Sequence, residues 1–302
     1  MGKNMTVSKS IADRAVVLER PNADTAIIRL VRESRRNTLS AQLIDELELV
    51  LNDIEAAPPR AVIVTGQGQA FCAGAEISEF KEMMGKPSVI STEYLPRILQ
   101  VFERLRNLPC PTIAAINGHA MGGGLELAIN CDFRIAAKGV LLALPEVQLG
   151  VVAAAAGVQQ LHRLVGRAKA LEILLLGDRV PADEALALGL VTSVCAPEDL
   201  EAKALEFADR FKRCAPSVVA ETKRAVYRSE GNDINAADDF AATAIFNATS
   251  APNFEEGIGA FLEKREASFS ALPAGTSSTG KGGKPPRQAS TPLCKDQACP
   301  RG

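Results

Sequence analysis

The order of apolar patterns along the chain is the feature that most restricts its fold. β-rich runs at 26–31, 61–65, 112–116 and 133–136 alternate with helical patterns, the clearest of which repeats apolar residues from Leu43 to Ile54. From about residue 154 the pattern is almost entirely helical, over 154–164, 167–176, 197–213, 217–229 and 234–248. This order predicts an α/β protein, in which strands joined by right-handed crossovers carry a helical region packed on them.

The last 31 residues, 272–302, differ in composition from the rest of the chain. Pro, Gly, Ser and Thr make up 16 of them, and five basic residues stand against one acid. Such a segment cannot bury enough apolar surface to offset its chain entropy. We therefore expect a flexible N-terminus over 1–13, a core domain over 14–200, a C-terminal helical region over 201–271 and a disordered tail over 272–302.

Composition and charge exclude several classes of protein. Hydrophobic residues make up 47% of the 302 positions, and no apolar run approaches the ~18 residues of a membrane span. The net charge of −2 gives no basic field for nucleic acid or an anionic membrane. The start of the chain lacks the apolar segment of a secretory signal. Seven scattered cysteines fit reduced thiols, so we expect a cytoplasmic protein that binds neither nucleic acid nor membranes.

Two glycine-containing loops follow predicted strands. The first runs from Thr65 to Ile77, and the second runs from Asn117 through three consecutive glycines to Gly124 and into an apolar helical run. Glycines at a helix start let the backbone approach a ligand and aim unpaired N–H groups at it. If each loop supplied one N–H to the same oxygen, the pair would form an oxyanion hole. Tight turns that serve only packing are the alternative.

Two glutamates stand next to apolar runs. Glu126 lies within the run 125–129, and Glu146 follows the run 140–144 and a proline. A carboxyl group buried in such surroundings has its pKa raised toward values that suit proton transfer. Structural ion pairs are the alternative.

Other polar residues near these positions receive structural interpretations. With only two histidines in the chain, a Ser-His-Asp triad or a His-rich metal site is disfavoured. We expect His119 to form a hydrogen bond within its loop and Cys72 to serve packing. Asp132 and Arg134 are assigned structural roles.

Four segments together resemble motifs of the enoyl-CoA hydratase/isomerase (crotonase) superfamily. They are Ala70–Ile77, Asn117–Glu126, Leu144–Gly150 and Ala260–Arg265, in the family's order and with ordinary spacing. The resemblance covers about residues 14 to 270, so it leaves out the tail. It implies a crotonase-type ββα spiral core with a C-terminal helical trimerisation region, and a homotrimer or hexamer.

The resemblance also implies a set of site residues. The oxyanion-hole amides would be those of Ala75 and Gly123, and the catalytic acids Glu126 and Glu146. Further positions would contact the acyl-CoA, the last two from a neighbouring subunit: Ala73, Ile77, Gly122, Phe261 and Lys264.

These residues predict an enoyl-CoA hydratase, a lyase that hydrates 2,3-enoyl-CoA thioesters to 3-hydroxyacyl-CoA or catalyses the reverse dehydration. Retention of both acids favours a hydratase by analogy with the family. The acyl-CoA would be the only small-molecule partner, with no metal and no cofactor beyond the CoA of the substrate. A double-bond isomerase is the alternative, and a crotonase-fold protein that binds CoA or RNA without turnover is the alternative of another class.

One segment departs from the family pattern. After Gly150 the common hydratase sequence is a proline-glycine-rich turn, whereas this chain has Val151, Val152 and four alanines before Gly157. Backbone donors would survive such a change, but alanine disfavours positive φ, so the shape of this loop is open.

Overall fold

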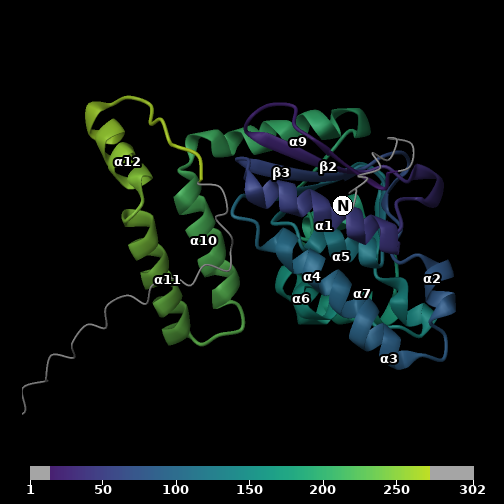
Figure 1. Ribbon diagram of the computed structural model, residues 1–302. Helices are drawn as coiled ribbons and strands as arrows, with labels where there is room; N and C mark the ends of the chain where they lie inside the picture. Colours follow the sequence, from purple (N-terminus) through teal and green to yellow (C-terminus); the bar gives the residue numbers. More distant parts are fainter. Residues whose placement is uncertain (1–13, 273–302) are drawn as a thin grey trace, which may run out of the picture.

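The computed structural model describes residues 14–272 and builds them from two β-sheets and surrounding helices (Figure 1). The predicted flexible segment 1–13, and the predicted tail from residue 273 onward, lie outside the described residues. The larger sheet has the strand order β1-β2-β3-β5-β7-β10. Its strands are β1 (Val16–Glu19), β2 (Thr25–Leu30), β3 (Ala61–Gly66), β5 (Thr112–Ile116), β7 (Phe133–Ala137) and β10 (Ser193–Cys195). β1 runs antiparallel to β2, and the other neighbours are parallel.

The smaller sheet repeats the chain order of the larger one. It has the order β4 (Ala70–Cys72), β6 (His119–Met121), β8 (Leu141–Ala143) and β9 (Val180–Pro181). β3, β5 and β7 are each followed by one of its first three strands and then by a helix. These helices are α2 (Ile77–Glu82), α5 (Gly123–Ile129) and a 3-10 helix at Pro145–Leu149. The chain therefore winds through three ββα turns, as the resemblance implies.

Burial explains why these segments form a layered core. Every residue of β3 and β5 is buried, as expected for parallel strands covered on both faces. The helical pattern between Leu43 and Ile54 forms α1 (Ala41–Ala56), in which six apolar residues are buried and Leu49 is exposed. Ser40 caps this helix by accepting a hydrogen bond from the amide of Leu43 at 3.3 Å. α9 (Leu200–Asp209) packs against β3, β5 and β7, on the opposite side of the sheet from α1 in Figure 1.

The remaining helices include those predicted from residue 154 onward, with differences at the ends, and others that were not predicted. They are α3 (Pro87–Val89), a π-helical turn (Ile90–Tyr94), α4 (Leu95–Arg106), α6 (Gly157–Val165), α7 (Arg167–Leu176), α8 (Ala182–Ala187), α10 (Pro216–Ser229), α11 (Ile234–Thr249) and α12 (Pro252–Glu263). Single 3-10 turns lie at Glu33–Arg35, Pro197–Asp199 and Arg210–Arg213. Within the predicted helical region 201–271, α9 packs on the sheet, whereas α10, α11 and α12 lie to one side of the sheet in Figure 1.

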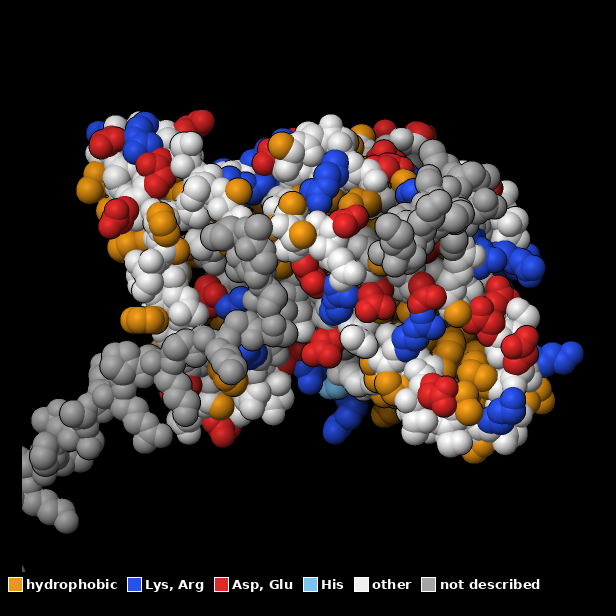
Figure 2. Space-filling view, viewed as in Figure 1, with side chains coloured by type: hydrophobic (Ala, Val, Ile, Leu, Met, Phe, Trp, Pro, Cys, Tyr) orange, Lys and Arg blue, Asp and Glu red, His pale blue; other side chains and the backbone are white. Residues whose placement is uncertain are grey.

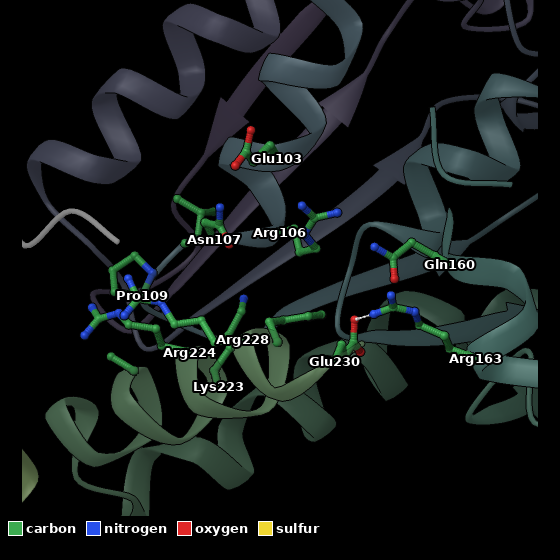
Figure 3. Close-up of a pocket in the computed structure, with 13 residues that line it drawn as sticks. Glu103, Arg106, Asn107, Pro109, Gln160, Arg163, Lys223, Arg224, Arg228 and Glu230 are labelled. Atoms are coloured by element: carbon green, nitrogen blue, oxygen red, sulfur yellow. Dashed lines mark hydrogen bonds and ion pairs between the residues drawn. The ribbon is translucent and has the colours of Figure 1, made fainter. Parts of the chain in front are cut away.

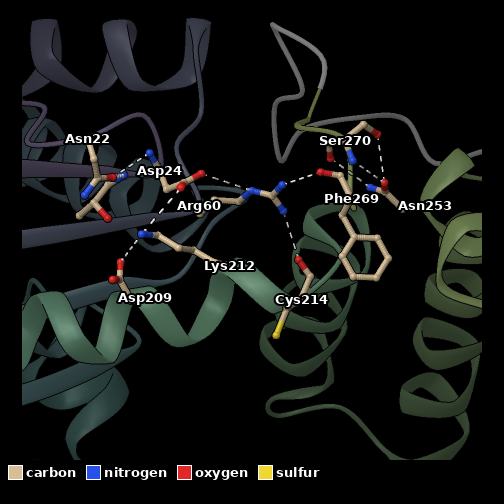
Figure 4. A network of polar contacts seen from close by, with 10 residues as sticks. Asn22, Asp24, Arg60, Asp209, Lys212, Cys214, Asn253, Phe269 and Ser270 are labelled. Carbon is tan, nitrogen blue, oxygen red and sulfur yellow. Dashed lines mark hydrogen bonds and ion pairs between the residues drawn. The ribbon is translucent and has the colours of Figure 1, made fainter. Parts of the chain in front are cut away.

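The segment that follows α12 returns to the core and is tied there by Arg60, at the start of β3 (Figure 4). The Arg60 guanidinium donates hydrogen bonds to the carbonyls of Phe269, at 2.6 Å, and Cys214, at 3.2 Å. Asn253 of α12 accepts hydrogen bonds from the amide and the hydroxyl of Ser270. These contacts hold the C-terminal helices to the body through backbone atoms.

Asp132, just before β7, anchors α10. Its carboxylate accepts hydrogen bonds from Lys223 at 2.6 Å, Tyr227 at 2.7 Å and the amide of Thr112 at 2.7 Å. Figure 3 shows the adjoining cavity of about 410 Å³ between α4, α6 and α10. Three of its basic side chains are paired with acids: Lys223 with Asp132, Arg163 with Glu230, and Arg224 with Glu221. This polar interface holds α10 on the body, and none of the predicted site residues lines the cavity.

Among residues 14–272, no helix has both the length and the apolar character needed to cross a membrane. The five cysteines of the range are unpaired.

Candidate active site

The first glycine loop is held in place by two asparagine side chains. Asn37 donates from Nδ2 to the carbonyls of Gln67, at 3.0 Å, and Ala70, at 2.9 Å. Asn117, from the second loop, accepts from the amide of Gly66 at 2.9 Å and donates to the carbonyl of Gly68 at 2.9 Å. The two loops are therefore fixed to each other at the carboxyl ends of β3 and β5.

Asn37 was not among the predicted site residues. Its backbone has a positive φ of 54°, a conformation that asparagine adopts more readily than most residues. The only signal in the sequence is an asparagine ahead of an apolar helix, which is too common to identify it.

The amides of Ala75 and Gly123 come together where the two loops meet. A Cβ atom added at Gly123 would lie 3.8 Å from the nitrogen of Ala75, and one added at Gly74 would lie 3.3 Å from the nitrogen of Gly123. Neither amide donates a hydrogen bond within residues 14–272. Two free N–H groups from separate loops at one point can bind a single oxygen that carries negative charge.

Glu126 lies one turn into α5 and is only 4% exposed. Its Oε1 accepts three backbone hydrogen bonds, from Ala155 at 2.7 Å, Ala156 at 2.8 Å and Gly157 at 2.9 Å. Burial raises the pKa of Glu126, and the three N–H donors oppose that rise. The carboxylate thus accepts the hydrogen bonds of backbone amides at the start of α6, where the N-cap residue Ala156 has no side-chain acceptor.

The backbone angles of the segment from Val151 to Ala156, which departs from the family pattern, show how it can present these amides. Ala156 has φ −168°, which is extended backbone, and the positive-φ positions other than glycine in the described residues are Arg36, Asn37 and Lys264. The segment therefore presents its amides without a left-handed alanine, so the sequence change leaves the donors in place.

Glu146 enters from the 3-10 helix that follows β8. A Cβ atom added at Gly122 would lie 2.8 Å from its Oε1, so the glycine leaves space for the carboxyl group. The other oxygen, Oε2, is buried and has no hydrogen-bond partner among the described residues. Burial, with a smaller contribution from the charge of Glu126, raises the pKa of Glu146 to about 7. No salt bridge within 14–272 includes either glutamate, so the ion-pair alternative is not supported.

The other predicted acyl-CoA contacts divide into two groups. Ala73 lines a cavity of about 530 Å³ together with Arg36, Met121 and Arg179, and Ile77 is 60% exposed at the first turn of α2. Phe261 and Lys264 lie at the end of α12, which Figure 1 places on the far side of the C-terminal helices from α5. The structure therefore does not bring these two residues to the glutamates of the same chain.

The structural interpretations of three residues are confirmed. His119 accepts a hydrogen bond from the amide of Leu141 at 3.1 Å. Burial raises the pKa of the Cys72 thiol to about 12, so the thiolate does not form near neutral pH. Arg134 is buried and donates to backbone carbonyls, at 2.6 Å to Leu190 and 2.7 Å to Cys131. These backbone partners give Arg134 the structural role expected of it.

Comparison with known proteins gives consistent matches. Residues 20–271 match the sequence profile of the family described as enoyl-CoA hydratase/isomerase. The short-chain-enoyl-CoA hydratase of Clostridium acetobutylicum is 37% identical over 253 residues, which are 83% of this chain and 95% of that protein. The mitochondrial enoyl-CoA hydratase of Pongo abelii is 33% identical over 82% of this chain and 84% of its own length. The crystal structure of an enoyl-CoA hydratase from Bacillus anthracis has a TM-score of 0.80 at 36% identity, covering 85% of this chain and 99% of that chain.

Proposed function

The chain belongs to the enoyl-CoA hydratase/isomerase family, and we propose that within it the protein is an enoyl-CoA hydratase. It would add water across the 2,3 double bond of an enoyl-CoA thioester, or remove water in the reverse direction. The observation that carries this proposal is the meeting of two free backbone amides, Ala75 and Gly123, beside the buried Glu126 and the half-buried Glu146.

The two amides would polarise the thioester carbonyl. When water attacks the third carbon, negative charge moves onto the carbonyl oxygen and forms an enolate. Two preorganised N–H groups stabilise that charge more than they stabilise the neutral substrate, which lowers the barrier. Because backbone dipoles meet the charge, the proposed chemistry asks for no cofactor beyond the CoA of the substrate.

The two glutamates would have opposite protonation states. Three amide donors favour the ionised form of Glu126, which suits it to take a proton from the attacking water. Glu146 has a bare buried oxygen and a pKa of about 7, which suits it to deliver a proton to the second carbon. The water oxygen bonds to the third carbon as its O–H bond and the π bond between the second and third carbons break, and the second carbon takes the proton of Glu146. Glu126 is then protonated and Glu146 ionised, and transfer of one proton from Glu126 to Glu146 restores both.

The cavity beside Ala73 is the proposed site for the polar part of CoA. Arg36 and Arg179 line it, and guanidinium groups pair well with phosphate oxygens. It lies beside the first loop, so a thioester on the oxyanion amides could extend into it.

The decisive experiment is a panel of enoyl-CoA thioesters. Hydration of 2-enoyl-CoA to the 3-hydroxyacyl product supports the hydratase. Conversion of a 3-enoyl-CoA to a 2-enoyl-CoA without hydration would identify the isomerase instead. Tight binding of CoA esters without turnover would identify a protein that only binds them.

Raising the pH through about 7 is expected to lower the hydration rate, because the proton on Glu146 is then lost. Stability should follow the same direction. The pKa of Glu146 is raised from 4.5 to about 7 on folding, so its contribution is complete below pH 4.5 and is lost as the pH rises through about 7. A series of kcat and thermal-unfolding measurements across this range tests both. A rate that stays constant or rises over the window would contradict the assignment of Glu146 as the proton donor.

A trimer, or a multiple of one, is the proposed assembly. Apolar side chains are exposed along the α11–α12 pair, as Figure 2 shows on the left of the molecule: Ile245, Phe246, Ile258, Phe261 and Leu262. Phe261 is 79% exposed, and an exposed apolar face of this kind marks an interaction site.

Light scattering of the purified protein should give a mass of three or six chains. Phe261→Asp should lower that mass, whereas Leu49→Asp, at an exposed leucine of α1, should not. A fully active monomer at high dilution would rule the assembly out.

A further inference from the structure

The peptide unit that carries the Ala75 N–H is held at its carbonyl end. That carbonyl, which belongs to Gly74, accepts a hydrogen bond from the backbone amide of Leu39 at 2.8 Å. A trans peptide unit is planar and its C=O and N–H point in opposite directions, so a bond that fixes the carbonyl also fixes the direction of the N–H. Leu39 and Ala75 also form a parallel β-bridge. Leu39 therefore sets where the first oxyanion amide points.

The side chain of the same leucine reaches the second amide. A Cβ atom added at Gly123 would lie 2.7 Å from Cδ1 of Leu39, which is nearer than the nitrogen of Ala75 at 3.8 Å. The methyl group therefore occupies the space in which a side chain of residue 123 would stand. Leu39 is only 1% exposed, so the packed core around it leaves this methyl group little freedom to move.

The second peptide unit is held by the helix that it begins. The carbonyl of Gly122, in the same peptide unit as the Gly123 N–H, accepts a hydrogen bond from the amide of Glu126 at 3.0 Å. The Gly123 N–H is thus fixed relative to α5, and α5 as a whole carries it toward or away from Ala75. What remains to be set is the position of the start of α5 relative to the first loop, and the Leu39 side chain lies at that point.

One residue therefore contacts both halves of the oxyanion hole through different atoms. We propose that Leu39 is a positioning residue that sets the separation and the relative direction of the Ala75 and Gly123 amides. Two donors stabilise an enolate oxygen fully only when both lie within hydrogen-bond distance of the place that this oxygen takes. Their separation therefore bears directly on the barrier of the reaction.

This inference rests on the proposed oxyanion role of the two amides. Leu39 acts through Ala75 and Gly123, so its effect needs no contact with the substrate. Truncating its side chain should weaken the polarisation of the thioester carbonyl more than it weakens binding, because the rest of the acyl-CoA supplies other contacts.

Leu39→Ala removes the δ-methyl groups and leaves the backbone amide in place. The start of α5 can then move relative to Ala75, and a displacement of about 1 Å can cost roughly 10²-fold in rate. We expect kcat for crotonyl-CoA to fall about 10- to 10²-fold with KM changed less than about threefold. Leu39→Val leaves a smaller cavity and should give a smaller loss in the same direction, and it is the deciding variant if Leu39→Ala does not fold.

Leu47→Ala is the matched control. Leu47 is a fully buried leucine of α1, so its truncation also leaves a cavity in the core. It should lower the melting temperature, as Leu39→Ala does, but leave kcat of the folded protein unchanged.

Infrared absorption of bound butyryl-CoA is the measurement that a merely structural role would not move. This saturated thioester cannot be hydrated, and an isotope label on its carbonyl carbon separates its band from those of the protein. Hydrogen bonds from the two amides should move the carbonyl band to lower frequency in the wild type and in Leu47→Ala. Most of that displacement should be lost in Leu39→Ala.

The band and the rate separate failure of this inference from failure of the proposed function. A wild-type band in folded Leu39→Ala would overturn the inference, and so would equal losses of kcat in Leu39→Ala and Leu47→Ala, which would assign both to core packing. If the band of the wild type itself does not move on binding, the two amides form no oxyanion hole and the inference falls with them. If that band moves but no enoyl-CoA is hydrated, the hydratase function fails, while the band in Leu39→Ala still decides the inference.

Discussion

Replacing either glutamate by glutamine is expected to lower kcat for hydration by about 10²–10⁴-fold. Glutamine keeps the shape of the side chain but cannot accept or deliver the proton. In Glu126→Gln the three amides from Ala155, Ala156 and Gly157 still find a carbonyl oxygen, so the site should keep its form and bind the thioester. In Glu146→Gln the proton donor is lost. Loss of the enoyl-thioester absorbance measures the rate in both.

The double variant and the stability separate this mechanism from its alternatives. If both acids act on one water, the losses should be far from additive. An isomerase would lose turnover in Glu146→Gln and keep much of it in Glu126→Gln. The exposed Glu206, paired with Lys203, gives the control variant Glu206→Gln with unchanged kcat. Near-wild-type hydration by either site variant would remove that residue from the mechanism.

Stability should change in the opposite direction to activity for Glu146→Gln. Above pH of about 7 the carboxylate of Glu146 is ionised while its Oε2 is buried without a hydrogen-bond partner among the described residues, and a neutral amide costs less to bury. A variant that is more stable in mildly alkaline buffer but inactive would indicate that Glu146 is retained for chemistry. Unfolding of the variant, seen by circular dichroism, would instead assign the residue a structural role.

The parts of the fold that sequence could predict are those with long, regular patterns. The helical repeat from Leu43 to Ile54 and the buried runs that became β3 and β5 each extend over several residues, so their periodicity is informative. β4, β6 and β8 have three residues each, which is too short for alternation to be recognised. The predicted helices omit α12, whose interior contains Gly257 and Gly259 and so has low helix propensity.

The candidate site likewise contains residues that the sequence could predict and residues that it could not. Glu126, Glu146 and the glycine loops were predictable because each lies in a local motif whose residues are adjacent in the chain. Asn37 was not, because its relevance depends on hydrogen bonds to a segment far away in sequence. The donors to Glu126 come from an alanine segment whose sequence departs from the family, and backbone amides leave no side-chain signal.

Gly124→Ala is expected to cause the largest loss of stability of any single change considered. A Cβ atom at this position would lie 2.0 Å from the carbonyl oxygen of Cys72 and 2.7 Å from its carbonyl carbon. Both are backbone atoms of β4, so no side chain can move aside, and α5 must shift away from the smaller sheet. Overpacking against such a surface costs about 3 kcal/mol or more in the free energy of unfolding, measurable by denaturant titration.

The same shift should lower activity beyond the loss of folded protein, because α5 begins at Gly123 and its amide would move relative to that of Ala75. A displacement of about 1 Å at a catalytic group can cost roughly 10²-fold in rate. Gly259→Ala is the control. Its Cβ would meet nothing nearer than Arg265 Nη2 at 4.0 Å, and replacing a glycine inside α12 should raise stability by up to ~1 kcal/mol. If both substitutions had the same effect, the contact of Gly124 with β4 would not be what fixes α5, and the positioning of the oxyanion amides would need another cause.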